Sequence, residues 1–361
     1  MKVAVVGGGI VGATCAYYLK KEGVYAKVFD FGVGQATSAS CGIICPWFSK
    51  RRNKIWYKTA RLGADFYDKL VKDLERDNVL CDFYERCGVF LLKNNDEKLE
   101  ELYELAKTRR VESELIGELK ILSLEEAKEK IPSFTGVKRV LYASGGARVD
   151  GKKLVKTLLN SAQCEVVKKK VTLEIIDDNY YVLGEKFDAV ILATGAWVSD
   201  ILTPHGYEVL VRAQKGQLID YEITDKNTKN YPVIMPEGEL DIIAFGDGKI
   251  SVGATHEDDK EYDLTIDDKL KSFEEDAKKF LPILKNAKVL GYRVGTRAYT
   301  QDYSAFFGEV PKLKNVFAIS GLGSSGLTTG PIIAYNVVQN ILGKNGELNA
   351  KDYKIENYIK K

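Results

Sequence analysis

The chain has 361 residues, of which 45% are hydrophobic and 29% charged, and its 53 basic and 51 acidic side chains leave a formal net charge of +2. This composition is typical of a soluble globular protein with a full core, and the charge balance indicates neither a nucleic-acid nor a membrane-surface partner. No apolar run approaches the roughly 18 residues of a membrane span, and no signal peptide precedes the first apolar run. We therefore expect a cytoplasmic protein without a membrane span.

The cysteines do not form the pattern of a disulfide framework or a metal site. They number six in this long chain: Cys15, Cys41, Cys45, Cys81, Cys87 and Cys164. The pair Cys41 and Cys45 has no neighbouring histidine or further cysteine to complete a metal site. We expect reduced thiols and no metal.

The first thirty residues predict a nucleotide-binding unit. An apolar run at 2–6, too short for a helix, predicts a buried strand and is followed by Gly7-Gly-Gly-Ile-Val-Gly12. Residues 13–19 have a helix pattern, and 26–30 predict a second strand that ends in an acid. Strand, G-x-G-x-x-G, helix, strand and acid follow in the order that a dinucleotide site needs.

Each position of this motif has a physical role. Gly7 permits the tight turn, Gly9 lets backbone N–H groups approach a pyrophosphate, and Gly12 lets the helix pack closely on the strand. The positive N-terminal end of the helix that follows faces the phosphates. Asp30 is placed to accept hydrogen bonds from the adenosine ribose and would repel a 2′-phosphate. The motif thus predicts an ADP-containing cofactor and disfavours NADP.

The middle of the chain alternates between helical and strand patterns. Apolar spacing predicts helices over 57–76, 98–109, 123–130, 152–162 and 269–281, and Ser123 with Glu126 forms a candidate capping box. Strands are predicted at 88–92, 165–167, 171–176, 180–183 and 188–195, and an antiparallel β region at 207–221, 232–235, 241–245 and 249–254. Alternation at both ends with a β-rich middle indicates one domain interrupted by a second.

A second glycine-rich turn lies near the C-terminus. The strand predicted at 315–320 leads into Gly321-Leu-Gly-Ser-Ser-Gly326, and a helix is expected over 331–342 with Pro331 near its first turn. Backbone N–H groups in such a turn form another electropositive nest. An extended flavin nucleotide can use both nests, whereas a nicotinamide enzyme needs only the first.

Motifs along nearly the whole chain resemble those of the FAD-dependent D-amino-acid oxidase superfamily, which includes glycine oxidases, sarcosine oxidases and D-amino-acid dehydrogenases. In chain order the matching segments are 7–12, 37–42, Ala147-Arg-Val-Asp150, Leu192-Ala-Thr-Gly-Ala-Trp197, 212–217, Val252-Gly-Ala-Thr-His-Glu257, 297–302 with Gly308, and 321–326. Singly each motif is weak, but eight in family order are strong.

The resemblance implies a Rossmann-like FAD-binding domain of the α/β class, interrupted by a substrate domain of antiparallel sheet and helices. We expect the FAD-binding domain to comprise 1–80, 138–205 and 290–361, and the substrate domain 81–137 and 206–289. The residues expected to bind FAD are Gly7, Gly9, Ile10, Val11, Gly12, Asp30, Thr37, Ser38, Ser40, Cys41, Gly42, Val171, Thr194, Gly195, Trp197, Arg297, Gly321, Gly323, Ser324, Ser325, Gly326 and Leu327.

The resemblance also implies that Arg297 lies over the flavin and binds the substrate carboxylate, for which a guanidinium fork is well suited. Arg293 and Arg212 are nearby alternatives. Tyr299 and Tyr303 flank this arginine segment, and His256 is the better placed of the chain's two histidines to act as a base; the other is His205. Trp47, Phe48 and Phe245 are candidates for an apolar wall or for plain core.

Departures from the family pattern restrict what carries over. Gly295 stands where sarcosine oxidases attach flavin through a cysteine, so we expect non-covalent FAD. Ser251 stands where they place an oxygen-activating lysine, so direct use of oxygen is in doubt. Gln301 and Ala298 replace family prolines, Ala213-Gln-Lys215 interrupts the R-G-Q spacing, and no tyrosine stands at 241–245, where amino-acid oxidases carry one. Substrate identity therefore stays open.

We expect an enzyme that oxidises the CH–NH bond of a small amino or imino acid, either a D-amino acid, glycine, sarcosine or a proline-type compound, by hydride transfer to flavin N5. The electron acceptor would be oxygen, a dye- or quinone-type compound or a protein, and a homo-oligomer is possible. The alternatives are an FAD-dependent dehydrogenase of a 2-hydroxy acid or glycerol phosphate, with Lys50-Arg-Arg52 as phosphate ligands, and an FAD subunit of a larger electron-transfer complex. An NAD-linked dehydrogenase ranks third, because of the second glycine-rich turn.

Overall fold

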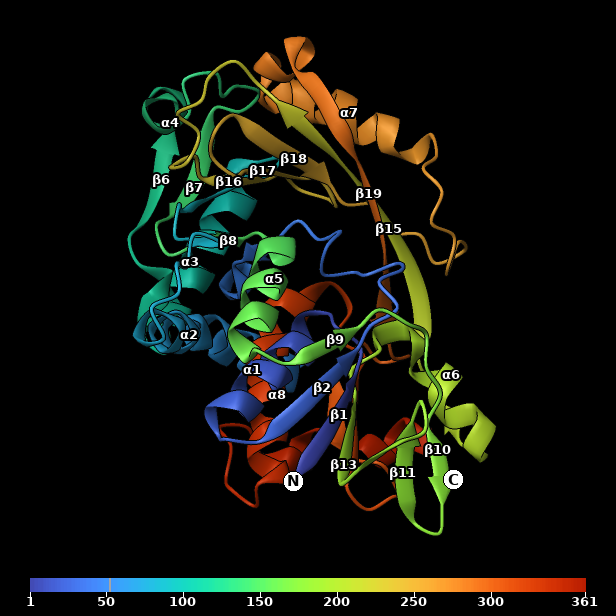
Figure 1. The fold of residues 1–361 in the computed structure, drawn as a ribbon. Helices are drawn as coiled ribbons and strands as arrows, with labels where there is room; N and C mark the ends of the chain where they lie inside the picture. The colour runs from blue at the N-terminus through green and yellow to red at the C-terminus, as the bar shows by residue number, and fades with distance from the viewer. Residues whose placement is uncertain (52) are drawn as a thin grey trace.

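The computed structural model describes residues 1–51 and 53–361; Arg52, one of the basic residues considered above, lies outside them. Two large sheets organise the chain (Figure 1). A six-stranded sheet contains the N-terminal strand, and an eight-stranded sheet is built mostly from the middle of the sequence. Within the described residues, no helix is long and apolar enough to cross a membrane.

The six-stranded sheet has the order β20-β21-β13-β1-β2-β9. Its members are β1 (Lys2–Val6), β2 (Tyr25–Phe29), β9 (Glu165–Val167), β13 (Ala189–Leu192), β20 (Phe306–Glu309) and β21 (Val316–Ser320). All neighbours pair in parallel except β20 with β21. The central strand β1 is buried from Val3 to Val6 because helices cover the sheet, as a parallel sheet requires.

Helices α1 (Ile10–Lys21), α5 (Gly151–Ala162), α8 (Gly326–Ile341) and α2 (Lys54–Arg76) form a layer beside this sheet (Figure 1). Helix α1 packs on both α5 and α8, and α8 packs on α2. The first ten residues of α1 are all buried, including small residues such as Ala13 and Ala16. The helix therefore starts inside the molecule, at the carboxyl end of β1.

The C-terminal helix differs from its prediction. Helix α8 begins at Gly326, five residues before the expected start, and Pro331 lies inside it. A proline within a helix removes the bond to the carbonyl four residues earlier, which here belongs to Leu327. The Tyr67 hydroxyl of α2 donates to that carbonyl oxygen at 2.7 Å. A partner from a neighbouring helix thus allows the helix to pass through Pro331.

The eight-stranded sheet has the order β19-β15-β18-β17-β16-β5-β7-β6. Its members are β5 (Val89–Leu91), β6 (Leu119–Ser123), β7 (Arg139–Ala143), β15 (Arg212–Glu222), β16 (Val233–Met235), β17 (Asp241–Ala244), β18 (Lys249–Gly253) and β19 (Lys288–Tyr299). The β region is antiparallel as expected except where β5 pairs in parallel with β16. Helices α3 (Asp96–Arg110), α4 (Leu124–Lys130) and α7 (Lys269–Phe280) accompany it, and the predicted capping box of Ser123 and Glu126 starts α4.

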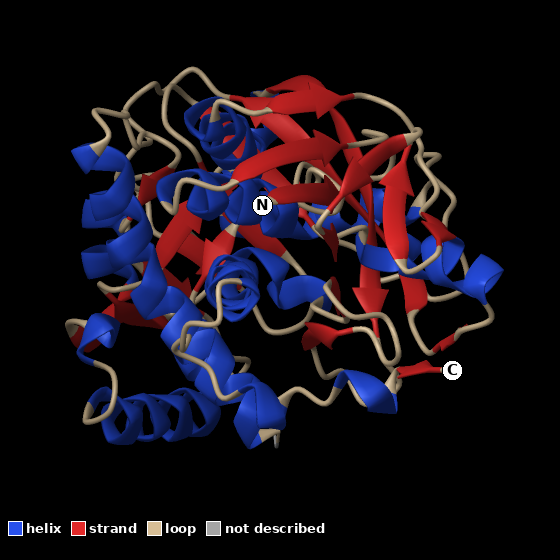
Figure 2. Cartoon of the chain, turned by 60° about the horizontal axis from the view of Figure 1, so that its bottom comes forward, coloured by secondary structure: helices blue, strands red, loops and turns tan. Residues whose placement is uncertain are grey.

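Smaller elements complete the chain. Strands β10 (Glu174–Ile176), β11 (Asn179–Val182) and β12 (Glu185–Phe187) form an antiparallel sheet, and β3 (Ile43–Ile44) and β4 (Tyr84–Glu85) flank β8 (Ala147–Val149). The last strand, β22 (Ile359–Lys360), pairs with β14 (Glu208–Val209), and Figure 2 shows this chain end at the edge of the molecule. Residues 171–173, predicted as strand, precede β10 and make no strand pairs.

Sheet membership differs from the predicted domain boundaries at two places. Strand β7 and nearly all of β19 fall in segments assigned to the FAD-binding domain, yet both pair within the eight-stranded sheet. The long strands β15 and β19 pair over their full lengths and run alongside the six-stranded sheet toward α6 (Val198–Leu202) (Figure 1). Two adjacent strands thus connect both halves of the molecule. The domain boundaries themselves stay a prediction.

Candidate active site

Two cavities open at the carboxyl ends of the parallel strands. The first, of about 180 Å³, is lined by the turn after β1, Asp30 and the segment 193–201. The second, of about 360 Å³, is lined by the segment 39–46, the turn 323–328 and residues of the eight-stranded sheet. Both are lined by Ala36, Thr37, Gly323 and Gly326, so they meet there and form one elongated site.

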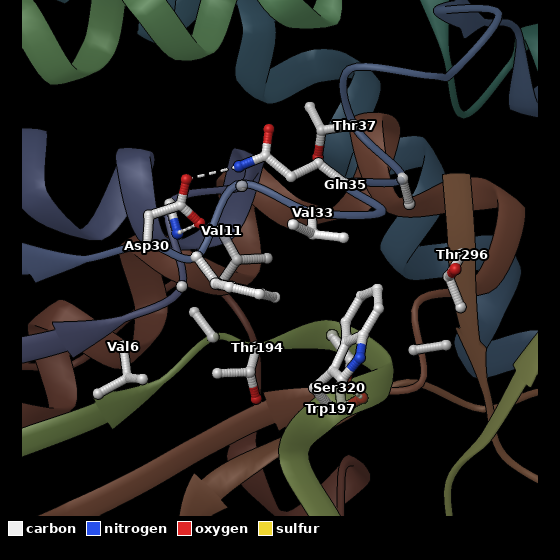
Figure 3. Close-up of a pocket in the computed structure, with 18 of the residues that line it drawn as sticks. Val6, Val11, Asp30, Val33, Gln35, Thr37, Thr194, Trp197, Thr296 and Ser320 are labelled. Atoms are coloured by element: carbon white, nitrogen blue, oxygen red, sulfur yellow. Dashed lines mark hydrogen bonds between the residues drawn. The ribbon is translucent and has the colours of Figure 1, made fainter. Parts of the chain in front are cut away.

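The first cavity has the features of a nucleotide site. Residues 7–11 line it, and a Cβ on Gly9 would meet only the Thr37 hydroxyl, at 3.4 Å, so the backbone there is open to a ligand. Asp30 accepts hydrogen bonds from the Gly8 backbone N–H at 3.1 Å and from Gln35 Nε2 at 2.6 Å, as Figure 3 shows. These bonds fix the Asp30 carboxylate at the cavity wall, where ribose hydroxyls would reach it.

Two hydroxyls provide a direct test of whether a ligand fits this cavity. Thr194 Oγ1 and Thr296 Oγ1 are buried and have no hydrogen-bond partner among the described residues. Both residues line the cavity, together with Val171, Gly195 and Trp197 (Figure 3). Because a buried hydroxyl without a partner costs free energy, these two hydroxyls fit a polar ligand between them.

Four residues predicted to contact cofactor or substrate do not line either cavity: Gly12, Ser38, Gly321 and Tyr299. The role of Gly12 is packing, because a Cβ there would lie 1.8 Å from the Gly7 carbonyl oxygen. Ser38 instead offers its carbonyl to Arg293 at 3.0 Å. A Cβ on Gly321 would meet the Ser304 carbonyl oxygen at 2.7 Å, so this glycine permits a close backbone contact.

Tyr299 supports the second glycine-rich turn from behind. Its hydroxyl accepts a hydrogen bond from the Ser324 backbone N–H at 3.0 Å, and its ring leaves no room for a side chain on Gly323. Trp56, which sequence reasoning missed, lines the second cavity and donates from Nε1 to the Ser325 hydroxyl at 3.1 Å. Residues 323–328 therefore present their backbone to the second cavity at the N-terminus of α8, an electropositive position.

Arg297 enters the second cavity from β19. Its Nη1 donates to Gln214 Oε1 at 3.0 Å and to the Thr255 carbonyl at 2.8 Å. Nε and Nη2 have no protein acceptor among the described residues, and no carboxylate pairs with this guanidinium there. Gln214 and Thr255 thus fix its orientation and leave donors free for a carboxylate ligand.

His256 lies beside Arg297 at the cavity wall. Its Nδ1 is 3.4 Å from Glu239 Oε2 and is otherwise without a partner among the described residues. Burial, and then the positive charge of Arg297, lower the pKa of His256, so the ring is neutral at neutral pH. The second histidine, His205, is remote from this wall, and its Nε2 bonds the Leu173 carbonyl.

Asp241 is a charged residue of the cavity that sequence reasoning did not select. It opens β17 and lines the second cavity, and its carboxyl group forms no hydrogen bond or ion pair with the described residues. Burial raises the pKa of Asp241 to about 8. In the sequence, Asp241 is a single acid at the head of an otherwise apolar strand. It stands in the segment 241–245, where amino-acid oxidases carry a tyrosine.

Arg293, which the sequence offered as an alternative to Arg297, forms an anchor with Ser251 between the sheet and the cofactor loop. Arg293 Nε and Nη2 donate to the two oxygens of Asp220 at 2.9 Å each, and Nη1 donates to the carbonyls of Ser38 and Ser40. The Ser251 hydroxyl also bonds Asp220. This network holds the loop 36–42 against β19.

Other candidate residues lie outside the two cavities. Trp47 and Phe48 belong to the core, one of the two alternatives that the sequence left open, and Phe245 packs against that core beside Arg148. Tyr303 is 52% exposed and packs edge-on against Tyr299. Lys50 pairs with Glu101 at 3.0 Å.

An extended nucleotide cleft that leads to an arginine-lined chamber defines a flavin-dependent oxidoreductase. Residues 2–339 match the sequence model of the FAD dependent oxidoreductase family, DAO, and the chain belongs to this family. It is 36% identical to the "Uncharacterized oxidoreductase YurR" of Bacillus subtilis, over 97% of both chains. It is 28% identical to the glycine oxidase of Pseudomonas putida, over 91% of both.

A solved structure, iminodiacetate oxidase (IdaA) from Chelativorans sp. BNC1, superposes with a TM-score of 0.92 at 28% identity, over 97% of this chain and 98% of the other. The protein is therefore an FAD-dependent enzyme with the fold of these oxidases. The open backbone at Gly9 and the free hydroxyls of Thr194 and Thr296 fit that cofactor.

Proposed function

We propose that the enzyme oxidises the CH–NH bond of a small amino or imino acid by hydride transfer from the α-carbon to flavin N5, giving an imine that water hydrolyses to a 2-oxo acid. One observation carries this proposal: the guanidinium of Arg297 faces the second cavity with free donors and no protein carboxylate. The similarity to a glycine oxidase and an iminodiacetate oxidase supports it.

The residues of the chain act by binding and orienting. Arg297 holds the substrate carboxylate, and Gln214 and the Thr255 carbonyl keep the guanidinium in place. FAD, when bound, supplies a two-electron acceptor. The turn 323–327 at the start of α8 places backbone N–H groups where negative charge develops on reduction. Tyr299 and Trp56 fix that turn and act as positioning residues.

Non-covalent FAD is part of this proposal. Position 295 lines the second cavity, and a Cβ there would lie 2.8 Å from Ala39 Cβ and 3.0 Å from Ala36 Cα. A cysteine at this position would collide with the loop 36–39. Denaturation in acid is expected to release all the yellow colour into the supernatant, whereas colour retained in the pellet would contradict non-covalent binding.

A second candidate is the oxidation of a 2-hydroxy acid, which needs a base for the hydroxyl proton. The observation that favours it is His256, whose lowered pKa leaves a neutral ring at the cavity wall. Glycerol phosphate is less suited, because a phosphate dianion asks for several cations and Arg297 is the only arginine or lysine that lines this cavity among the described residues.

An anaerobic titration separates these candidates. Glycine, sarcosine, D-alanine, both prolines, lactate and glycerol 3-phosphate would be added in turn to the purified protein while the flavin absorbance is followed. Bleaching by an amino or imino acid is the expected result. Bleaching by hydroxy acids alone would assign the protein to the second candidate, and admitting air, a quinone or a dye afterwards identifies the acceptor that restores the colour.

A further inference from the structure

The second cavity carries opposite charges on different strands of its wall. Arg297 projects from β19, and Asp241 opens β17. Strands β15 and β18 lie between them in the sheet. Because no described residue pairs with the Asp241 carboxyl, its acceptors face the cavity free. A zwitterionic amino acid carries a carboxylate and an ammonium on one α-carbon. It matches a wall with one free guanidinium and one free carboxyl group.

The groups around Asp241 do not neutralise it. Cys41 and Cys45 lie near it on either side of β3, and burial raises the pKa of both thiols, so they are uncharged at neutral pH. Glu239, two residues earlier, is half exposed and lies beside His256. Arg293, on the same strand as Arg297, is already paired with Asp220. The Asp241 carboxyl group is thus without a counter-ion among the described residues.

The oxidation requires the substrate nitrogen in its neutral form. An amine with a pKa near 10 carries a proton at neutral pH. Its nitrogen then has no lone pair with which to form the C=N bond as the α-hydrogen leaves. A base with a pKa near the working pH is the most effective acceptor for that proton. The raised pKa of Asp241, about 8, lies in this range.

We propose that Asp241 is the proton acceptor for the substrate ammonium, an inference that rests on the function proposed above. An N–H bond of the ammonium breaks and an O–H bond forms on the Asp241 carboxylate, with no change of oxidation state. The neutral amine then loses its α-hydrogen and two electrons to FAD, and the nitrogen lone pair completes the C=N bond. The proton leaves Asp241 to water when the product departs.

The test is the pH dependence of flavin reduction in single turnovers of the holoenzyme, with the amino acid that bleaches the wild type. Asp241→Asn removes the acceptor at constant size. The expected result is a loss of about 100-fold in the reduction rate at pH 8, at the lower end of what general bases contribute. The loss shrinks toward pH 10, where more of the substrate arrives as free amine.

The matched control is Glu237→Gln, which also replaces a carboxylate by an amide. Glu237 lies on the connection between β16 and β17, four residues before Asp241. Glu237 does not line the cavity and pairs with Lys98 at 3.0 Å. Its pH profile is expected to follow that of the wild type. An Asp241→Asn profile with the wild-type shape and rate would overturn the assignment while leaving the proposed function intact. A wild type that no amino or imino acid reduces would overturn both.

A second measurement does not depend on turnover. Infrared difference titration of the holoenzyme detects the C=O band of a protonated carboxyl group. A band that disappears with a midpoint near pH 8 in the wild type, and is missing in Asp241→Asn, supports the assignment. Its absence in the wild type would overturn it, whatever the stability of the variant.

Discussion

Glycines of the first turn have separate roles that substitution distinguishes. A Cβ on Gly9 meets only Thr37 Oγ1, at 3.4 Å, whereas a Cβ on Gly12 would lie 1.8 Å from the Gly7 carbonyl oxygen. We expect Gly9→Ala to fold but to lose FAD affinity by about 100-fold, because the methyl group would occupy the space of the pyrophosphate. Gly12→Ala is expected to destabilise the protein itself, since helix and strand must separate.

Fluorescence titration of the apoproteins with FAD, together with their thermal unfolding, checks this pair. Gly9→Ala should keep the melting temperature of the wild-type apoprotein, and Gly12→Ala should melt lower. Equal FAD affinity in Gly9→Ala and the wild type would contradict the role assigned to Gly9.

The glycine positions were predictable from sequence because their requirement is local: a motif fixes which backbone must pass close to a ligand. Asp241 was not recognised, and Arg293 was named only as an alternative to Arg297, because their environments come from segments distant in sequence. Asp241 lies near Cys41 and Cys45. Arg293 binds Asp220 and the carbonyls of Ser38 and Ser40. Spacing within one strand contains no information about these neighbours.

Among the elements, the segment 258–268 is a strap between β18 and α7 that reaches the cofactor cavity. Tyr262 donates to the Ala196 carbonyl at 3.0 Å and packs 5.4 Å from the ring centre of Trp197, a cavity residue. Lys215, whose side chain is fully buried, binds the strap through Asp263 at 3.2 Å and Asp267 at 3.0 Å. The strap is therefore attached both to a residue of the cofactor cavity and to β15.

We expect Lys215→Met to lower the free energy of unfolding, because the partly exposed carboxylates of Asp263 and Asp267 and the buried carboxylate of Glu257 lose their cation. Two Thr265 hydrogen bonds and then Lys215 lower the pKa of Asp263 to about 2, and bonds from Gln217 and Lys215 lower that of Asp267. Depressed pKa values stabilise the fold above about pH 4, and this stabilisation is lost as the pH falls toward 2. Chemical denaturation from pH 7 to pH 3 should therefore show a flatter acid slope in Lys215→Met, and an identical slope would contradict the role of Lys215.

Helix α8 depends on a partner for the carbonyl that Pro331 frees. Tyr67→Phe removes the donor to the Leu327 carbonyl and leaves that oxygen buried and unsatisfied. We expect a loss of about 1–2 kcal/mol in urea unfolding. Tyr84→Phe is a matched control, because the Tyr84 ring stacks on Tyr67 at 5.1 Å while its hydroxyl bonds only Arg86 among the described residues. A Tyr67→Phe variant as stable as this control would contradict the proline account.

The start of α8 illustrates why element boundaries were harder to predict than elements. The sequence indicated that Pro331 opens the helix, because an isolated helix accepts proline best in its first turn. The Tyr67 hydroxyl of α2 lies 264 residues before Pro331 in the sequence. Its hydrogen bond to the Leu327 carbonyl removes the cost that would have ended the helix at the proline. Such tertiary compensation is invisible to local patterns.

At the scale of the whole molecule, the two glycine-rich turns and the long strands β15 and β19 converge on one elongated site. The order of strand, turn and helix at both ends of the chain predicted the six-stranded sheet and the cofactor. The substrate side was less predictable, because its wall is assembled from a loop, the strands β15, β16, β17 and β19, and residues of α2 and α8. The proposed substrate binding depends on Arg297, and the proposed proton transfer depends on Asp241.

The most direct test is the dissociation constant of the reducing amino acid in anaerobic single turnovers of Arg297→Gln. We expect it to rise at least about 100-fold, with the flavin spectrum retained, because the carboxylate loses a charged, two-donor partner. Arg212→Gln is the control: Arg212 lies on the paired strand, binds Asp258 and does not line the cavity. A dissociation constant in Arg297→Gln that matches this control would contradict the claim that Arg297 holds the substrate.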